Sequence, residues 1–192
     1  MVTLATPADL RDLLGENATS LPDQLATLLL ELATAEVQAA AGQDLVQVID
    51  DQAAVMGTPS FWFALPQRPV TDVSSVEIDG EAVTDYKRFG ARLWRSRGWS
   101  QHVYEPSVVS VTYTHGYAPG DPALGLARKL TLDLTAALHA NPDGVTGGFS
   151  IDDYREQMVQ TGGDSRTNLL PALSRRLLRR TYGGRAGLVR IG

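Results

Sequence analysis

Cysteine is absent from this chain and histidine is scarce, and both shortages exclude whole classes of function. Without cysteine there is no disulfide scaffold, no thiolate zinc site and no cysteine nucleophile. The three histidines, His102, His115 and His139, are dispersed and lack the paired spacing of zinc ligands. We therefore expect no metal ion and no cofactor. The lack of cysteine also fits assembly in a reducing compartment.

Long hydrophobic runs are missing as well. The longest apolar-leaning stretch, residues 25–41, carries Glu31 and Glu36 near its middle, so it is not a membrane span. The first residues include an acid by position 9 and lack the basic and then apolar opening of a signal peptide. The sequence thus predicts a soluble chain with no membrane partner, large enough to bury a real core.

Catalytic arrangements are equally sparse. His115 stands between Tyr113 and Tyr117 and has the chemistry of a base, but no nucleophile elbow accompanies it. The acids at 50–51 and at 152–153 are adjacent, and adjacent side chains point apart on a helix or a strand. The glycine-rich loops lack the lysine and hydroxyl ending of a phosphate cradle. We expect no enzyme, and a turn or interface role for His115.

Helical signals occupy the first part of the chain. Thr6-Pro7 opens a short helix that Gly15 ends, and a second helix runs from about Pro22 to Ala41, before Gly42. The second helix is predicted to carry one apolar face, formed by Leu25, Leu28, Leu29, Leu32 and Val37. Its alanine-rich far end allows close approach of another helix, either inside the core or in a subunit contact.

A β-rich segment follows between Asp44 and His115, where the periodicity changes to alternation. We expect five or six short strands that pair as an antiparallel meander, because no helix-length crossover separates them. Asp79-Gly80 is a two-residue hairpin signal. In the last strand Val109, Val111 and Tyr113 are predicted to share one face.

Helical periodicity returns from Pro122 to Ala140. A capping pattern at Ser150 with Asp153 predicts a further short helix, and a basic helix is expected from about residue 169 to 182. The predicted fold class is α+β, a helical core that carries an antiparallel β insertion. Its predicted parts are the N-terminal core helices (1–43), the insertion (44–116), the C-terminal core helices (117–182) and a flexible basic tail (183–192).

Charge is distributed unevenly along the chain. The last 27 residues hold seven of its 17 basic residues and no acid, which leaves ten basic against 22 acidic residues elsewhere. In the basic helix Arg175 and Arg179 are spaced i,i+4, as are Arg176 and Arg180. Guanidinium groups bind carboxylates on an acidic protein rim or phosphates of DNA, and both partners stay open. A solvated amphipathic helix is the third reading.

The order of several short motifs resembles the head-to-tail connector family of tailed bacteriophages. The opening helices end at Ala39-Ala40-Ala41-Gly42, and the β segment holds Leu65-Pro66-Gln67-Arg68-Pro69-Val70. Val73-Ser74-Ser75-Val76-Glu77-Ile78-Asp79-Gly80 follows, and then Val111-Thr112-Tyr113-Thr114-His115-Gly116-Tyr117, a proline-containing loop and the helix after Pro122. The resemblance covers residues 8–160.

The resemblance implies a structural virion protein with no catalytic residues. Such connectors form a homo-oligomeric ring, typically a dodecamer, that binds under the portal, extends the DNA channel and joins head to tail. The implied partners are the portal protein, the next connector or tail protein, other copies of the chain, and packaged DNA that passes without sequence recognition. The implied location is the neck of the virion, after assembly in the host cytoplasm.

The portal-docking role is assigned here by charge alone, to the C-terminal segment. The predicted docking residues are Arg175, Arg176, Arg179, Arg180, Arg185, Leu188, Arg190 and Ile191. The alternative function is that of a DNA-binding phage accessory protein that uses the same arginine cluster.

Overall fold

The computed structural model describes residues 2–15, 21–102, 105–140, 150–151, 154–155 and 169–183. These residues separate into two compact units. A helical unit draws on residues 1–42 and 120–182, and a β unit is built mainly from residues 43–119. The predicted α+β class is confirmed, because helices and antiparallel sheets occupy separate parts of the chain.

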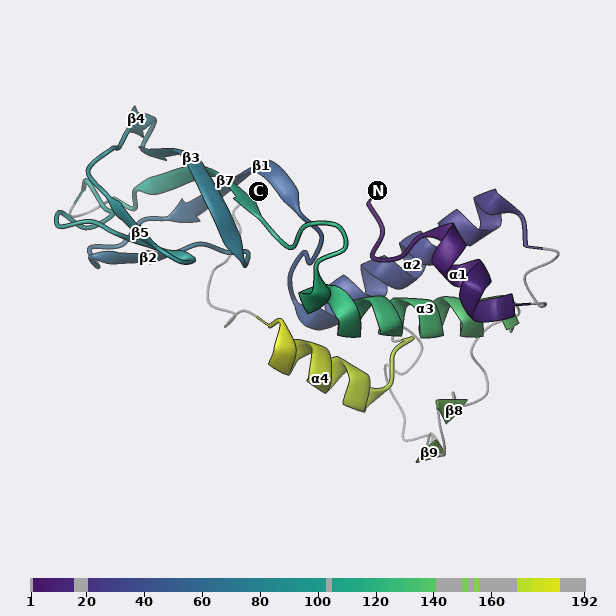
Figure 1. The fold of residues 1–192 in the computed structure, drawn as a ribbon. Coiled ribbons are helices and arrows are strands. Elements are labelled where there is room, and N and C mark those ends of the chain that lie inside the picture. The colour runs from purple at the N-terminus through teal and green to yellow at the C-terminus, as the bar shows by residue number, and fades with distance from the viewer. Residues whose placement is uncertain are drawn as a thin grey trace. The chain divides into compact units, whose positions relative to one another are not determined.

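The helical unit contains four α-helices and one short 3₁₀ helix among the described residues. They are α1 (Pro7–Leu14), α2 (Asp23–Ala41), η2 (Pro122–Leu124), α3 (Gly125–Ala140) and α4 (Ala172–Thr181). Helices α2 and α3 pack against each other, and each also contacts α1 and α4, so these two helices form the centre of the unit (Figure 1). Among the described residues, no helix is long and apolar enough to cross a membrane.

Helix α1 begins as predicted. The Thr6 hydroxyl accepts the N–H of Asp9, and the carboxylate of Asp9 accepts the N–H of Thr6. This backbone hydrogen bond from Thr6 is the main cause that lowers the pKa of Asp9. Arg128 of α3 lies 2.6 Å from the same carboxylate, so the cap also ties α1 to α3.

Helix α2 buries an alanine-rich side rather than its leucines. Its buried residues are Ala26, Leu30, Ala33, Thr34, Val37, Ala40 and Ala41. The prediction of one face that unites the leucines with Val37 is therefore wrong: Val37 is buried, whereas Leu25, Leu28 and Leu32 are exposed. Small side chains let neighbouring helices approach α2 closely, which leaves the leucines on the opposite side.

Helix α4 packs against this unit through few but deeply buried side chains. Leu178 is fully buried, as is nearly all of Tyr182, whose hydroxyl donates to the carbonyl of Ala123 at 2.7 Å. The backbone N–H of Leu169 donates to the carboxylate of Glu36 on α2. The helix starts at Ala172 rather than 169, because Pro171 takes an extended conformation as its N-cap.

The β unit holds two antiparallel sheets. A four-stranded sheet, in the order β1-β7-β3-β4, is formed by β1 (Val48–Met56), β7 (Val108–His115), β3 (Val70–Ile78) and β4 (Glu81–Ala82). A three-stranded sheet, in the order β2-β6-β5, is formed by β2 (Trp62–Ala64), β6 (Arg92–Trp94) and β5 (Lys87–Phe89).

The predicted meander is wrong, because the first strand pairs with the last. β1 lies along β7, with Ala53 opposite Val111, and β3 lies along the other side of β7. Both ends of an insertion must return to the unit that carries it, so pairing β1 with β7 brings them together. The described residues of the segment also hold seven strands rather than five or six. Two other strand-level predictions are confirmed: Asp79 and Gly80 form the β3–β4 turn, and Val109, Val111 and Tyr113 are buried together.

The core of the β unit is centred on Trp99, which is fully buried. Its ring packs 5.2 Å from that of Phe63 and 6.4 Å from that of Tyr86, measured between centroids. Its indole N–H donates to the carbonyl of Phe61, which satisfies its polar atom inside the core. Side chains from both sheets, including Val76, Val111 and Leu93, belong to this cluster.

One further prediction about secondary structure is wrong. Residues Ser150–Ile151 and Tyr154–Arg155 pair as two short antiparallel strands, β8 and β9, instead of beginning a helix. The expected capping pattern involves Asp153, which lies outside the described residues.

Candidate interaction surfaces

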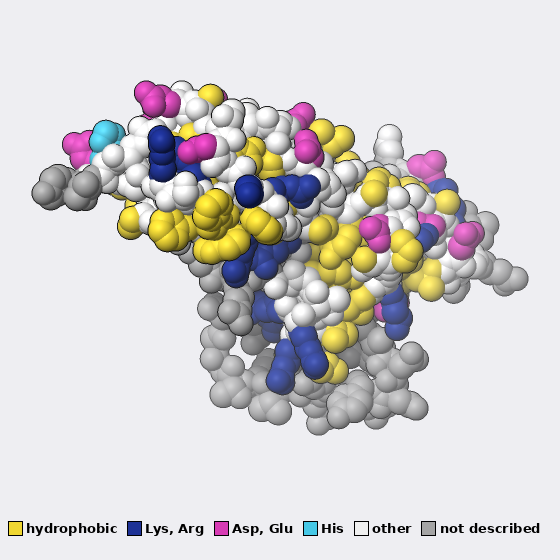
Figure 2. Space-filling model, turned by 60° about the vertical axis from the view of Figure 1, so that its left-hand side comes forward, with side chains coloured by type: hydrophobic (Ala, Val, Ile, Leu, Met, Phe, Trp, Pro, Cys, Tyr) yellow, Lys and Arg dark blue, Asp and Glu magenta, His cyan; other side chains and the backbone are white. Residues whose placement is uncertain are grey.

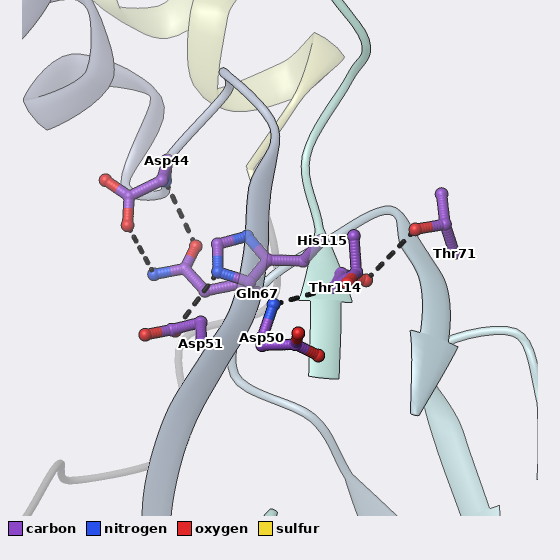
Figure 3. Close-up of polar contacts among 7 residues, drawn as sticks. All are labelled: Asp44, Asp50, Asp51, Gln67, Thr71, Thr114 and His115. Carbon is purple, nitrogen blue, oxygen red and sulfur yellow. Dashed lines mark hydrogen bonds and ion pairs between the residues drawn. The ribbon is translucent and has the colours of Figure 1, made fainter. Parts of the chain in front are cut away.

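The histidine singled out from the sequence lies in a polar cluster at one end of the β unit (Figure 3), in which His115 and Thr114 are buried and the other residues are partly or fully exposed. The His115 side chain is fully buried at the end of β7, and its Nε2 lies 3.1 Å from Oδ2 of Asp51 on β1. The Tyr113 ring packs beside the imidazole, with 5.1 Å between centroids. Among the described residues, Asp51 is the one hydrogen-bonding partner of this imidazole.

A β-bulge positions the two adjacent acids of this cluster. The register of β1 against β7 shifts between Val48 and Asp51, which inserts one extra residue on β1. Asp50 lies in the bulge with φ of 53°, and its N–H donates to the hydroxyl of Thr114. Ser74 donates to the carboxylate of Asp50 at 2.6 Å. The bulge thus directs Asp50 to the outer side of the sheet and Asp51 toward His115.

The rest of the cluster joins the incoming and outgoing chain. The side-chain amide of Gln67 accepts from the backbone N–H of Asp44 and donates to its carboxylate. Tyr117 donates its backbone N–H to Leu45 and accepts from Gln47. Together with the His115–Asp51 contact, these hydrogen bonds connect the first and last segments of the β unit, and we call them the clasp.

Four of the predicted docking arginines lie on α4, and they differ in exposure. Arg176, Arg179 and Arg180 are exposed, whereas Arg175 is half-buried and its Nε finds no hydrogen-bond partner among the described residues. Arg185, Leu188, Arg190 and Ile191 lie outside the described residues. The structure thus brings three of the eight predicted residues to the surface of one helix.

The leucines along α4 and just before it were expected to form one apolar side (Leu169, Leu170, Leu173, Leu177 and Leu178), but they differ in exposure. Leu170 and Leu178 are buried, but Leu173 is 70% and Leu177 43% exposed. Leu173 and Leu177 are spaced i,i+4, as are Arg176 and Arg180, so the exposed side of α4 mixes apolar and cationic groups. Protein interfaces often combine these groups, and arginine is enriched there.

The β unit carries a second surface that the sequence reasoning missed. Strand pairing places six side chains on one side of the three-stranded sheet, here called the aromatic face: Trp62, Ala64, Lys87, Phe89, Arg92 and Trp94. Phe63 and Leu93, on the other side, are buried in the core. Residues 61–65 (Phe-Trp-Phe-Ala-Leu) are apolar throughout, so the sequence alone does not show which of them face away from the core.

The opposite sheet presents acids. Strand pairing and exposure place six side chains on the outer side of the four-stranded sheet, here called the acidic face: Asp50, Gln52, Asp72, Glu77, Ser110 and Thr112. Hydrophobic side chains gather along the lower edge of the β unit with lysine and arginine beside them, and acidic side chains lie along its upper edge (Figure 2).

Two exposed carboxylates hold the ends of strands in place. Oδ1 of Asp79 accepts the N–H of Val108 at 2.7 Å, and this backbone hydrogen bond is the main cause that lowers the pKa of Asp79. The guanidinium of Arg95 donates to Asp85 at 2.7 Å and lowers the pKa of that carboxyl. Both contacts stabilise the charged form of the acid, so they favour folding at neutral pH.

Comparisons of the whole chain with known proteins find structural relatives. No protein-family model and no curated protein matches the sequence. A chain in the neck of an empty GTA particle, computed with C6 symmetry, matches with a TM-score of 0.58 and 15% identity over 98% of this chain and 94% of that one.

Two further solved structures match. One is the virion of a native gene transfer agent (GTA) particle, with a TM-score of 0.53 and 18% identity over 77% of this chain and 83% of that one. The other is the neck of a native GTA particle computed with C12 symmetry, with a TM-score of 0.50 and 15% identity over 96% and 91% of the two chains. This chain therefore shares its fold with chains of gene transfer agent necks, as its resemblance to head-to-tail connectors predicts.

Proposed function

We propose that this protein is a structural component of a virion neck, a head-to-tail connector without catalytic activity. The observation that carries the proposal is the fold shared with a GTA neck chain along nearly the whole of both chains. The order of sequence motifs supports the same conclusion independently. The burial of His115 supports a non-catalytic role for the one histidine that lies beside two tyrosines.

In finer terms, the chain forms a dodecameric ring under the portal protein and extends the DNA channel toward the next connector or tail protein. Packaged DNA passes through without sequence recognition. Assembly takes place in the host cytoplasm, and the finished ring lies at the head–tail interface. The C6 and C12 symmetries of the neck structures that share this fold support a cyclic arrangement.

The test of this function is whether the chain occupies the neck. Particles purified from a producing cell should contain the chain, and electron microscopy of particles with a tagged chain should place the tag at the head–tail interface. Particles that lack the chain, or that carry the tag on the head or tail tip, would overturn the proposal.

The arginine-rich end is our proposed portal-docking element, from Arg175 to Ile191. Removal of the whole segment from residue 166 onward is a poor test, because it deletes α4 and with it the buried Leu178 and Tyr182. A sharper pair of variants removes residues 184–192 alone, or reverses the exposed arginines by Arg176→Glu, Arg179→Glu and Arg180→Glu. Lys129→Glu, on an exposed position of α3, is the matched control.

Purified portal rings should retain the wild-type chain and the control and lose at least one of the two test variants. Full retention of both would move the docking assignment to another surface and leave the connector identity untouched.

The exposure of Arg176, Arg179 and Arg180 also favours a second candidate, a DNA-binding accessory protein. On that reading, affinity for random duplex DNA falls steeply with salt, with a log–log slope of about −0.9 for each phosphate contact. The arginine-reversed variant should then lose both the affinity and the slope. The neck proposal expects neither result.

A further inference from the structure

The β unit sorts its charges between its two sheets. The strands β1, β3, β4 and β7 hold five acids and no lysine or arginine: Asp50, Asp51, Asp72, Glu77 and Glu81. The strands β2, β5 and β6 hold Lys87, Arg88 and Arg92 and no acid. Because the two sheets enclose one core, the unit presents a cationic side and an anionic side.

We propose that the aromatic face of one copy docks on the acidic face of a second copy, so that neighbouring β units join side by side around the ring. This inference rests on the proposed ring function, and it names the surfaces through which the copies contact each other.

Exposure of large aromatic side chains supports an interface on the cationic side. Trp62 is 46% and Phe89 57% exposed, and their rings meet edge to face at 5.5 Å between centroids. Because the two rings already pack against each other, docking restricts them less than it would restrict two isolated side chains. Lys87 and Arg92 flank it on the same side of the sheet and form no ion pair among the described residues. Aromatic and arginine side chains of this kind dominate interface energetics.

The acidic face offers the matching chemistry. Asp72 and Glu77 are exposed, and no ion pair joins either carboxylate to a described residue. At one end of the same side Met56 pairs with Val108 across the strands, and the two side chains are 50% and 44% exposed. Aromatic rings therefore find an apolar site next to the carboxylates, and a thioether packs well against an aromatic ring.

Charge also decides which pairing of copies is favoured. Two aromatic faces in contact would set Lys87 and Arg92 against their own counterparts, and two acidic faces would set Asp72 and Glu77 against theirs. Like charges in an interface disfavour the wrong partner. The remaining pairing is head to tail, and a head-to-tail contact that closes generates a cyclic ring.

The absence of cysteine from the chain allows a clean crosslinking test. Arg92→Cys labels the aromatic face of one variant, and Glu77→Cys labels the acidic face of another. A bismaleimide should join the two variants when they are mixed and give much less product with either one alone. A mixture of Arg92→Cys with Lys129→Cys is the control and should stay uncrosslinked. Equal yields from single variants and from the mixture, or no product from a chain that still multimerises, would overturn the inference.

Charge reversal provides a second test, in which mixing two defective variants should restore association. One variant carries Lys87→Glu and Arg92→Glu, and the other carries Asp72→Lys and Glu77→Lys. Sedimentation velocity should show that each alone self-associates about tenfold or more weakly than wild type. A mixture should regain association, because every contact in an alternating assembly then pairs opposite charges. This recovery also shows that both variants are folded.

The outcomes separate this inference from the proposed function. Variants that remain monomers but still bind portal rings or reach the neck support the assigned surfaces and leave the function standing. If the charge-reversed variants form multimers of the same mass as wild type, the assigned surfaces are wrong but the proposed function is unaffected. Absence of the chain from particles contradicts the function. Binding of single-stranded oligodeoxythymidine that Trp62→Ala abolishes would assign the aromatic face to nucleic acid and overturn the inference.

Discussion

His115 and Asp51 join the last and first strands of the β unit through a contact of 3.1 Å that spans 64 residues of sequence. We expect His115→Ala to lower the free energy of unfolding by about 2–4 kcal/mol, because it leaves a cavity and removes a buried hydrogen bond. Asp51→Asn keeps the volume and should cost about 1 kcal/mol. Trp62, Trp94 and Trp99 all lie in the β unit, so tryptophan fluorescence in urea reports on this change. Equal stability of His115→Ala and wild type would contradict the clasp.

Gly116 follows this histidine with φ of 85°, and a Cβ there would lie 2.5 Å from the carbonyl oxygen of Val46. We expect Gly116→Ala to destabilise the β unit by about 3 kcal/mol or more, through backbone strain and collision with the backbone of the incoming chain. Gly120→Ala is the matched control, because Gly120 has a similar φ of 80° and open space around it. It should cost about 1–2 kcal/mol. Similar losses for the two variants would show that the close approach does not matter.

Tyr182 ties the end of α4 to η2 and the start of α3. Its hydroxyl donates to Ala123, and the N–H of Ala127 donates to the hydroxyl. We expect Tyr182→Phe to cost about 1–3 kcal/mol, because it leaves the buried N–H of Ala127 and the partly buried carbonyl of Ala123 without this partner. Thermal unfolding followed by far-ultraviolet circular dichroism monitors the helices. Tyr86→Phe is the control and should be nearly neutral, because no described residue hydrogen-bonds the Tyr86 hydroxyl. If it destabilises the protein as much as Tyr182→Phe does, the hydrogen bonds of Tyr182 do not explain the loss.

Acid should weaken the β unit through Asp79 and Asp85. Folding lowers the pKa of both carboxyls below the ordinary value of 3.8. The stability they contribute is therefore complete above pH 3.8 and is lost as pH falls through the lower folded-state pKa. Urea midpoints measured by tryptophan fluorescence should therefore fall in wild type as the pH is lowered below 3.8. Asp79→Asn keeps the turn, because asparagine tolerates positive φ, and it should flatten the dependence. An unchanged profile would exclude Asp79 as a contributor.

Local rules sufficed for parts of the fold that depend on neighbours in sequence. The cap at Thr6, the turn at Asp79 and the buried alternation of Val109 and Val111 follow from residues a few positions apart, and each was predicted correctly. The pairing of β1 with β7 joins residues about 60 positions apart, and a single sequence contains no local sign of it. The bulge that turns Asp51 toward His115 depends on that pairing, so this polar contact was missed as well.

The surfaces were predicted less well, for a related reason. Leucines at helical spacing on α2 resemble core residues in the sequence. In the structure the buried side of α2 includes Ala33, Ala40 and Ala41, because α1, α3 and α4 pack closely against that helix. The exposure of Leu173 and Trp62 depends likewise on what packs on the other side of their elements. Charge clustering near the C-terminus was visible from composition alone, since counting residues requires no knowledge of contacts.

The helical unit is interrupted in sequence by the β unit, since α2 ends at Ala41 and α3 begins at Gly125. A ribosome therefore finishes the whole β unit before it has made the second half of the helical one. Every strand partner, including β7 for β1, is then available, whereas α2 still lacks both α3 and α4. We expect the sheets to fold first during synthesis. The side of α2 that is buried in the finished protein should stay exposed to solvent until α3 and α4 emerge from the ribosome.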